Sequence, residues 1–479
     1  MAVPHGSLVS IAKGDNGAQR LTYKVGPFNI IPGQNDIGYN GMDQKPKVDG
    51  WITRMRPDLV YTDGTVPRVD VLHLHHGVWL NMDRRDATAP GLPERFFAAG
   101  EEKTIFTLPK GYGYRYKASD GWLLNHMIHN LTPVPAQVYM ILEIDFIPKS
   151  SPAAKGIKPV RPIWMDVRNG QIYPVFNVQK GSGEKGEYTY PNDEPAAYRG
   201  EGGKRNEWVA DQDGVLVGTA GHLHPGGLYT DLKLTRGGRT VNLFRSKAHY
   251  WEPAGAVSWD VAMTATTPKW RVKVKRGDVL SVSATYDSKR ASWYESMGID
   301  PVAFAPGVRG GVDPFSGKLD KRGKITHGHL RENRNHGGEA SGLPDPRKLA
   351  AGPVATAPLA LTDFLYGQGD LLSGGARSRP ATVAPGGSLT FVNRDAARTI
   401  FHTITACRAP CNRTTGIAYP LADGPVDFDS GELGFGPQGF TAAANRDTWS
   451  TPATLGAGTY TYFCRIHPFM RGSFRVSGS

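Results

Sequence analysis

Cysteine and long apolar runs are both scarce in this chain of 479 residues. Only three cysteines occur, at positions 407, 411 and 464, and so few exclude a small disulfide-rich scaffold. No apolar run reaches about 18 residues, so we expect no membrane-spanning segment. The first residues lack a charged stretch followed by an apolar one, and we expect a mature form from which a signal peptide has been removed.

Basic residues are numerous but do not gather in one place. Lysine and arginine number 56 against 44 aspartates and glutamates, and they form no stripe with interleaved aromatic residues. Nucleic acid is therefore not an expected partner. Long helical patterns are also lacking. The chain has 59 glycines and 36 prolines, and its apolar segments are short and alternating, which indicates an all-β chain. The length predicts roughly three domains of about 150 residues each.

The segment 462–472 places a thiol, an imidazole and a thioether close together, as Cys464, His467 and Met470. A trigonal set of two histidines and a cysteine with a weak axial methionine is the ligand geometry of electron-transfer copper. His402, on a separate apolar segment, is the candidate second histidine. The loop resembles the copper loop of the cupredoxins, with the amicyanin-like pattern Cys-x-x-His-Pro-x-Met. The resemblance implies a type 1 copper on these four residues.

The two remaining cysteines, Cys407 and Cys411, are separated by three residues and are a possible disulfide. Such a pair suits an oxidising compartment. We therefore expect an extracellular or periplasmic protein. The whole segment from 352 to 479 contains no lysine, which marks it as a separate domain.

A second histidine cluster occurs much earlier, where His73, His75 and His76 lie within four positions. Alternate residues of a regular strand share a face, so His73 would pair with His75 and His76 would face the other side unless a bulge redirects it. Two more histidines, His126 and His129, lie on the predicted strand 122–130. The next segment, 137–146, alternates cleanly between apolar and polar residues and predicts a half-buried strand.

A third cluster is the pair His222 and His224, at the end of a predicted strand. Because they are two residues apart, their Cβ atoms would lie roughly 6.6 Å apart on one face, and both imidazoles could reach one ion. Met297 lies further along, in a polar stretch where a core residue is not expected.

These residues together resemble the copper type II monooxygenases, typified by the peptidylglycine α-hydroxylating and dopamine β-monooxygenases, over roughly residues 60 to 300. The resemblance implies two copper sites, an electron-storing one on His75, His76 and His129 and an oxygen-activating one on His222, His224 and Met297. The sequence departs from the family at Ala220 and Pro301, where the family uses an arginine and a tyrosine for peptide substrates. A glycine-extended peptide is therefore not the expected substrate.

The predicted fold is all-β, with two jelly-roll-like β-sandwich domains followed by a cupredoxin Greek-key β-sandwich. The predicted boundaries are 1–155, 156–305 and 352–479, with a linker at 306–351. The linker contains His327, His329 and His336, for which a solvated covering loop and a fourth metal site are the two readings.

The leading hypothesis is a three-copper monooxygenase that hydroxylates a C–H bond of an unknown organic substrate with O2. The type 1 copper would relay electrons from an external donor. The alternative is a secreted copper-binding or electron-transfer protein without monooxygenase activity. A multicopper oxidase or nitrite reductase would connect its copper sites through a histidine beside the cysteine. Phe463 and Arg465 flank Cys464 here, so the sequence does not favour that class.

Overall fold

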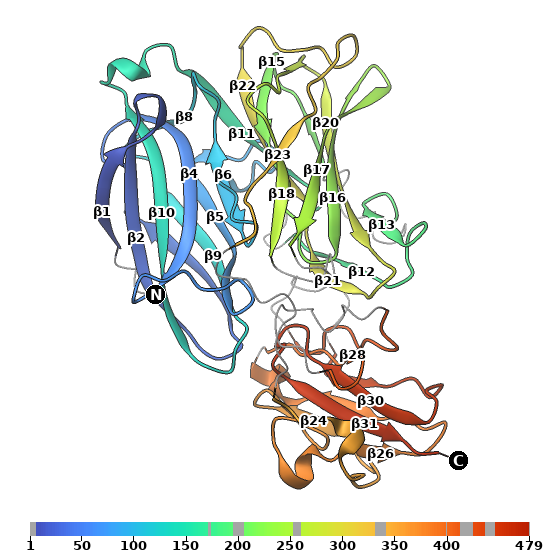
Figure 1. The fold of residues 1–479 in the computed structure, drawn as a ribbon. Coiled ribbons are helices and arrows are strands. Elements are labelled where there is room, and N and C mark those ends of the chain that lie inside the picture. Colours follow the sequence, from blue (N-terminus) through green and yellow to red (C-terminus); the bar gives the residue numbers. More distant parts are fainter. Residues whose placement is uncertain are drawn as a thin grey trace.

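The chain forms three β-sandwiches, drawn in blue to teal, green to yellow and orange to red in Figure 1. The computed structural model describes residues 6–170, 174–194, 206–251, 260–330, 342–398, 400–411, 425–435 and 446–478. Within these ranges the regular elements are strands and short 3-10 helices, so the predicted all-β fold class is confirmed. The 3-10 helices are η1 (Asp15–Gly17), η2 (Pro152–Ala154), η3 (Pro346–Lys348), η4 (Gly375–Ser378) and η5 (Arg394–Arg398).

The first sandwich packs one sheet against a four-stranded sheet that faces the second domain. The outer strands, in spatial order, are β1 (Gly6–Lys13), β2 (Gln19–Ile30), β10 (Ala136–Pro148), β4 (Gly50–Tyr61), which also pairs with β7 (Phe106–Thr107), and β8 (Tyr112–Tyr116). The inner strands are β3 (Asn35–Met42), β9 (Trp122–Asn130), β5 (Leu72–Arg85) and β6 (Pro93–Gly100). Met140, Leu142 and Ile144 of β10 are each 0% exposed, which confirms the predicted alternation of that strand.

The second sandwich is joined to the first through its own sheet. Strand β11 (Lys158–Asp166) pairs in parallel with β8 and antiparallel with β22 (Ile299–Pro306), so one sheet continues across both domains. Its remaining strands are β15 (Gly214–Thr219) and β19 (Val272–Val274). The opposite sheet contains β13 (Glu187–Tyr190), β14 (Glu207–Val209), β20 (Val279–Asp287), β16 (Gly227–Arg236), β17 (Arg239–Tyr250), β18 (Val261–Thr266) and β23 (Gly323–Ile325). Strand β12 (Phe176–Val178) pairs with β21 (Trp293–Ser296). Part of the segment predicted as a linker, β23, thus belongs to the second domain's sheet.

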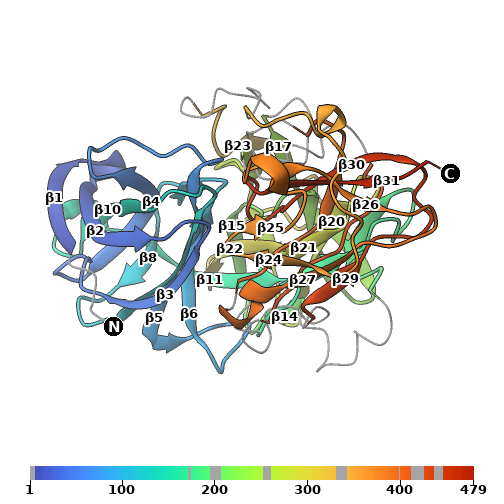
Figure 2. The ribbon, with the colours of Figure 1, turned by 90° about the horizontal axis from the view of Figure 1, so that it is seen from below.

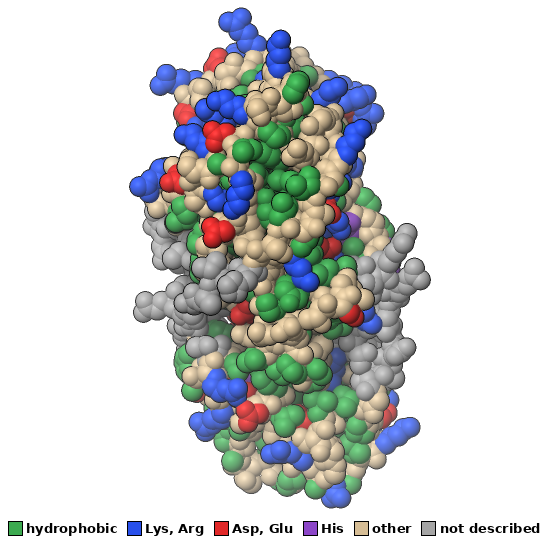
Figure 3. Space-filling model, turned by 90° about the vertical axis from the view of Figure 1, so that its left-hand side faces the viewer, with side chains coloured by type: hydrophobic (Ala, Val, Ile, Leu, Met, Phe, Trp, Pro, Cys, Tyr) green, Lys and Arg blue, Asp and Glu red, His purple; other side chains and the backbone are tan. Residues whose placement is uncertain are grey.

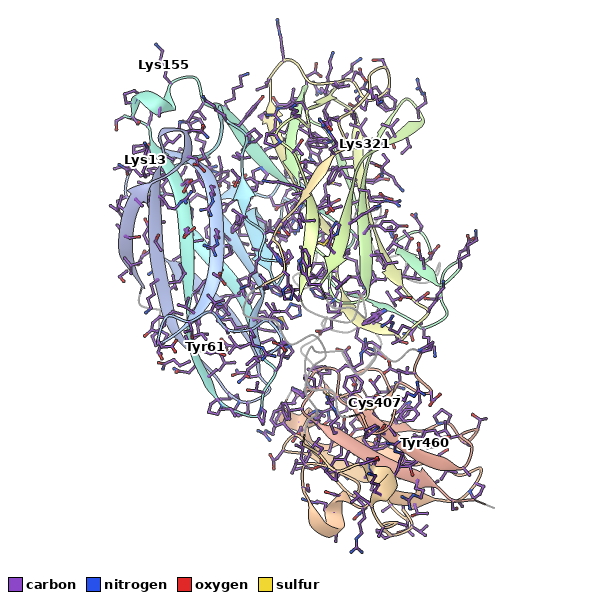
Figure 4. All side chains as sticks on the ribbon, in the orientation of Figure 1. Lys13, Tyr61, Lys155, Lys321, Cys407 and Tyr460 are labelled. Atoms are coloured by element: carbon purple, nitrogen blue, oxygen red, sulfur yellow. A yellow bond between two sulfur atoms is a disulfide. The ribbon has the colours of Figure 1, made fainter. Side chains whose placement is uncertain are left out.

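The third sandwich contains two four-stranded sheets. They are β25 (Leu365–Tyr366), β24 (Leu359–Thr362), β27 (Thr390–Asn393) and β29 (Thr448–Ser450), and β26 (Ala381–Val383), β31 (Arg471–Val476), β30 (Gly458–Phe463) and β28 (Thr405–Cys407). Cys407 forms a disulfide with Cys411, as the sequence predicted. Cys407 lies at the end of this domain nearer to the first two (Figure 4).

The third domain lies mainly below the second but contacts both of the others (Figures 1 and 2). Lys180 Nζ of the second domain donates a hydrogen bond to the Val426 carbonyl at 2.7 Å, and His467 Nε2 donates to the Gly33 carbonyl of the first domain at 2.7 Å. Lysines and arginines are spread over the face shown in Figure 3, mixed with apolar and acidic side chains. In the described part of the chain, no helix has the length and hydropathy that a membrane span needs.

Candidate metal centres

Three predicted ligands of the third domain converge at one buried point. Strand β30 ends just before Cys464, the chain turns through His467, and His402 approaches from the segment after η5. The two histidine Nδ1 atoms are 3.1 Å apart, and Cys464 Sγ lies 3.9 Å from His402 Nδ1 and 3.7 Å from His467 Nδ1. Met470 is fully buried and belongs to the same loop. The sequence prediction is consistent with this convergence.

The outer nitrogen of each histidine is already occupied. His402 Nε2 donates to Asp395 Oδ2 at 3.0 Å, and His467 Nε2 donates to the Gly33 carbonyl at 2.7 Å. In its neutral form each ring therefore presents its Nδ1 lone pair to the other ring and to the sulfur. A second partner that fixes the tautomer of a histidine is typical of metal ligands, and two facing lone pairs beside a thiolate favour a soft cation.

The electrostatics at Cys464 favour the thiolate. Burial raises the pKa of Cys464, but the hydrogen bonds and charges of His402 and His467 outweigh burial and hold that pKa well below its ordinary value. The backbone N–H groups of Thr403 and His467 each donate to Sγ at 3.3 Å. A thiolate with two histidines and a buried methionine is a ligand set that fits copper.

A β-bulge aligns the histidines of the first domain. The pairing of β5 with β9 shifts between Leu74 and His76, so that His73 lies opposite His129 and His76 lies opposite Met127. Without the bulge, His76 would face the other side of the strand. The extra residue is His75, and all three histidines are buried. The sequence analysis raised this possibility but could not decide it.

The rings of His73, His75 and His129 form a triangle with centroid separations of 5.8, 5.5 and 6.3 Å. A ligand nitrogen lies about 2 Å from the metal, and its ring centroid lies about 1 Å beyond, so three histidines on one ion would have centroids roughly 5 Å apart, and a bound ion would draw these rings closer by up to about 1 Å. The His75 and His76 rings are also 5.6 Å apart. His73 therefore competes with His76 as the partner of His75 and His129.

His126 is placed differently from the other four histidines. Its ring contacts Phe28 in the core of the first domain, its Nδ1 is 3.1 Å from Asn40 Nδ2, and its Nε2 is 3.2 Å from Asp36 Oδ2. It lies opposite Gly77 on β5, on the face turned toward the core. His126 is therefore a core histidine.

The predicted ligands of the second domain are gathered by one tyrosine hydroxyl. Tyr286, on β20, accepts from the backbone N–H of His224 and of Met297, both at 3.1 Å, and donates to the Met297 carbonyl at 2.6 Å. The backbones of His222 and Ile299 exchange hydrogen bonds of 2.8 and 3.2 Å. These contacts bring the loop of Met297 beside the His-x-His segment. Nothing in the sequence pattern marked Tyr286 for this role.

The side chains of the same histidines are oriented for their Nε2 atoms to act as ligands. His222 Nδ1 donates to Glu102 Oε2 at 3.0 Å, and His224 Nδ1 donates to the Glu295 carbonyl at 2.6 Å. His222 Nε2 is buried and has no hydrogen-bond partner among the described residues. That orphaned nitrogen fits a metal ligand.

The two histidine sets meet across the domain interface. The rings of His75 and His224 are 4.6 Å apart, and the ligand atoms of His75, His224 and Glu101 all lie within 4.8 Å of one another. Glu101 Oε2 is 3.9 Å from His75 Nδ1, and neither carboxyl oxygen has a hydrogen-bond partner in the described part of the chain. Burial, and then the charge of Glu102, raise the pKa of Glu101 well above its ordinary value. Sequence reasoning did not select Glu101 or Glu102.

Burial keeps these imidazoles neutral, which is the form that binds metals. It lowers the pKa of His73 to about 4 and that of His76 to about 3. Burial, together with neighbouring histidines, also holds the pKa values of His75, His129 and His224 well below the ordinary range. A cluster of uncharged nitrogens at neutral pH is suited to copper.

The first-domain cluster lies close to the loop of Cys464 and His467 in the third domain. Gly33, which accepts from His467, is two residues from Asn35, and Asn35 pairs directly with His129 between β3 and β9.

A cavity of about 410 Å³ lies between the first two domains. Its wall includes His76 of the first domain and His222 and Met297 of the second, so it reaches members of both ligand sets. Ala220 and Pro301 also line it. Side chains from both sandwiches fill the rest of the interface (Figure 4).

The remaining described histidines have structural partners. His327 contacts the carbonyls of Gly328 and Val261 at 2.6 and 2.9 Å, and His329 Nε2 lies 3.3 Å from Asp260 Oδ2. His249 Nε2 is 2.9 Å from Thr264 Oγ1. His336 lies outside the described residues. No metal-binding group forms from His327 and His329 within the described ranges.

No family model matches the sequence, and no curated protein matches it. Similar solved structures include a mutant of amicyanin in its Cu(I) form, with 20% identity over 29% of this chain and 94% of amicyanin and a TM-score of 0.15. A Cu-containing nitrite reductase from Thermus scotoductus is 15% identical over 55% of each chain, with a TM-score of 0.17, so this chain spans about half of that enzyme. A triple jelly-roll protein of an archaeal virus is 11% identical over 59% of this chain and 62% of its own, with a TM-score of 0.16. The fold is all-β, and the proposal of a function is based on the geometry of the candidate ligands.

Proposed function

We propose that this protein is a copper-dependent monooxygenase that hydroxylates a C–H bond with O2, with the third domain relaying electrons to the first two. The observation that carries the proposal is the closeness of the first histidine cluster to the loop of His467. His129 of that cluster pairs with Asn35, and Gly33, two residues before Asn35, accepts a hydrogen bond from His467 Nε2 at 2.7 Å. A redox loop placed against a buried histidine cluster is an arrangement suited to passing electrons between them.

Three ligand sets support three copper ions. The type 1 set is His402, Cys464, His467 and Met470, and the two interdomain sets are drawn from His73, His75, His76 and His129 and from His222, His224 and Met297. Bound copper would supply one-electron transfer at the first set and oxygen activation at the interdomain sets.

The chain's own residues orient the ligands. Glu102 and the Glu295 carbonyl hold Nδ1 of His222 and His224, which leaves Nε2 of each ring for the metal. Tyr286 fixes the spacing between His224 and Met297. The cavity offers a place for substrate beside Met297. Hydroxylation of R–H by O2 gives R–OH and water and consumes two electrons and two protons, so an external donor is required.

The experiment compares wild-type protein with Cys464→Ser in two regimes, after elemental analysis has counted the copper ions. Steady-state O2 consumption with a weak donor is expected to fall in the variant, because the relay is lost. A single turnover after full chemical reduction is expected to remain. His249→Ala, an exposed histidine outside the clusters, is the control. Equal steady-state rates in wild type and Cys464→Ser would refute the relay.

The same measurements test the alternative, a copper-binding or electron-transfer protein without monooxygenase activity. It predicts reducible copper with no O2 consumption by any variant. We also propose an extracellular or periplasmic location, because Cys407 and Cys411 form a disulfide and such bonds persist in oxidising compartments.

A further inference from the structure

The wall of the interdomain cavity is mainly apolar. Tyr39 and Ile105, which are 48% and 38% exposed, are among the lining residues and mark an apolar entrance. The inner wall is formed by aliphatic and aromatic side chains of both domains, including Val78, Phe97 and Trp164. A cavity of about 410 Å³ is in the range that encloses a small organic molecule.

Three charged residues line the cavity, and the two that are buried, Arg95 and Glu102, already have partners. Arg95 donates to Asp86 and to Asn169 Oδ1, each at 2.8 Å. Glu102 accepts from His222 at 3.0 Å and from the Gly100 N–H at 3.0 Å. The third, Lys324, is exposed. A charged ligand in the buried part of the cavity would therefore find no free counter-charge among the described residues, which is strongly unfavourable.

Two threonines that line the cavity, Thr104 and Thr267, have buried hydroxyl groups without a hydrogen-bond partner among the described residues. A buried hydroxyl without a partner is rare in native proteins, so a ligand that offers a hydroxyl or carbonyl would satisfy one of them. Specificity by a few polar groups in an apolar pocket is the usual design of small-molecule sites.

We propose that this cavity binds an uncharged, largely apolar organic molecule that carries at most a hydroxyl or carbonyl group, and that this is the substrate class. The assignment of the molecule as a substrate rests on the proposed monooxygenase function. Binding itself does not, because it depends only on the cavity wall. The acceptor end would contact Thr104 or Thr267, and the reacting carbon would lie near His222 and Met297.

The test measures binding to the copper-free full-length protein by calorimetry, so that it succeeds or fails independently of turnover. The probes are phenylbutanone, phenylbutanoate and phenylbutylammonium, which are similar in size and differ in charge. The neutral ketone is expected to bind about 100-fold more tightly than either ion, because neither ion finds a counter-charge. Tighter binding of either ion, or no binding of the ketone up to its solubility limit, would overturn the proposal.

Two variants locate the site. Ala98→Phe places a ring in the cavity and is expected to weaken ketone binding about tenfold or more, whereas Ala12→Phe, on the exposed strand β1, is the matched control. Leu123→Arg adds a cation to the cavity wall and is expected to bind phenylbutanoate about tenfold more tightly than the wild-type protein does. If Ala98→Phe binds the ketone as wild type does, the ligand lies elsewhere and the proposal fails. Binding that follows these predictions without O2 consumption would keep the cavity assignment and refute the monooxygenase.

Discussion

Gly33 is the point at which the first domain approaches the copper loop, and Gly33→Ala separates docking from copper binding. Gly33 has φ +66, and an added Cβ would lie 2.7 Å from Phe364 Cε1 and 2.8 Å from His467 Cδ2. Carbon atoms in ordinary contact are about 3.5 to 4.0 Å apart, so the two segments must separate by about 1 Å. The hydrogen bond from His467 Nε2 to the Gly33 carbonyl, now 2.7 Å, would then exceed the length at which it contributes.

The expected effect on stability has two parts. Alanine at a positive φ costs about 1 kcal/mol, and loss of the hydrogen bond costs about another 1 kcal/mol. Gly64→Ala is the matched control, because Gly64 has φ +85 and no atom within 4 Å of an added Cβ. The control therefore shares the backbone strain without the collision. We expect Gly33→Ala to lower the free energy of unfolding by about 1 kcal/mol more than Gly64→Ala.

The functional assay is steady-state O2 consumption with a weak donor, beside the visible absorption of the copper thiolate. Gly33→Ala is expected to retain the blue absorption, since none of the four ligands is changed, but to turn over more slowly than Gly64→Ala. A single turnover after chemical reduction should be equal in the two variants. Equal steady-state rates would show that docking at Gly33 is not part of the electron path.

Three further changes probe the ligands and the pH dependence. Asp395→Asn, which removes the carboxylate at 3.0 Å from His402 Nε2, is expected to weaken type 1 copper binding about 10- to 100-fold in a chelator competition, and an unchanged affinity would contradict the assigned tautomer. Met297→Leu is expected to abolish O2 consumption and keep the blue absorption, and wild-type activity would exclude Met297 as a ligand. Burial raises the pKa of Asp300 from the usual 3.8 to about 7, so the folded protein favours the protonated carboxyl. The stabilisation that this group contributes is fully present below pH 3.8 and is lost as the pH rises through 7. Urea unfolding of Asp300→Asn at about pH 8 should therefore show up to roughly 4 kcal/mol more stability than wild type, with little difference near pH 4.

The fold class and the convergence of His402, Cys464 and His467 could be predicted from sequence because each depends largely on local patterns. The alternation of β10 and the spacing of Cys464, His467 and Met470 are visible within short segments, and a shared fold then brings His402 close. The disulfide between Cys407 and Cys411 is equally local.

The arrangement of the interdomain candidate ligands was harder to predict, because it depends on strand register and on long-range contacts. The face of His76 is decided by a one-residue shift against β9, which alternation alone cannot give. The importance of Tyr286 and Glu102 comes from hydrogen bonds to His224 and His222, which are distant in sequence. The assignment of His75, His76 and His129 to one copper remains a prediction, now with His73 as a competitor.

Glu101 gives the sharpest test of whether the two histidine sets act as one metal-binding assembly. Its carboxyl group is fully buried, lies 3.9 Å from His75 Nδ1 and shares a compact group with His224 of the other domain. Glu101→Gln keeps the shape but removes the anionic ligand, so interdomain copper should bind more weakly and its electron paramagnetic resonance signal should change, while the blue absorption stays. Glu94→Gln is the control. Glu94 is also buried, but its carboxylate accepts a hydrogen bond of 2.6 Å from the Tyr114 hydroxyl and belongs to none of the histidine groups. An unchanged copper count and spectrum in Glu101→Gln would mean that each domain binds its copper without this carboxylate.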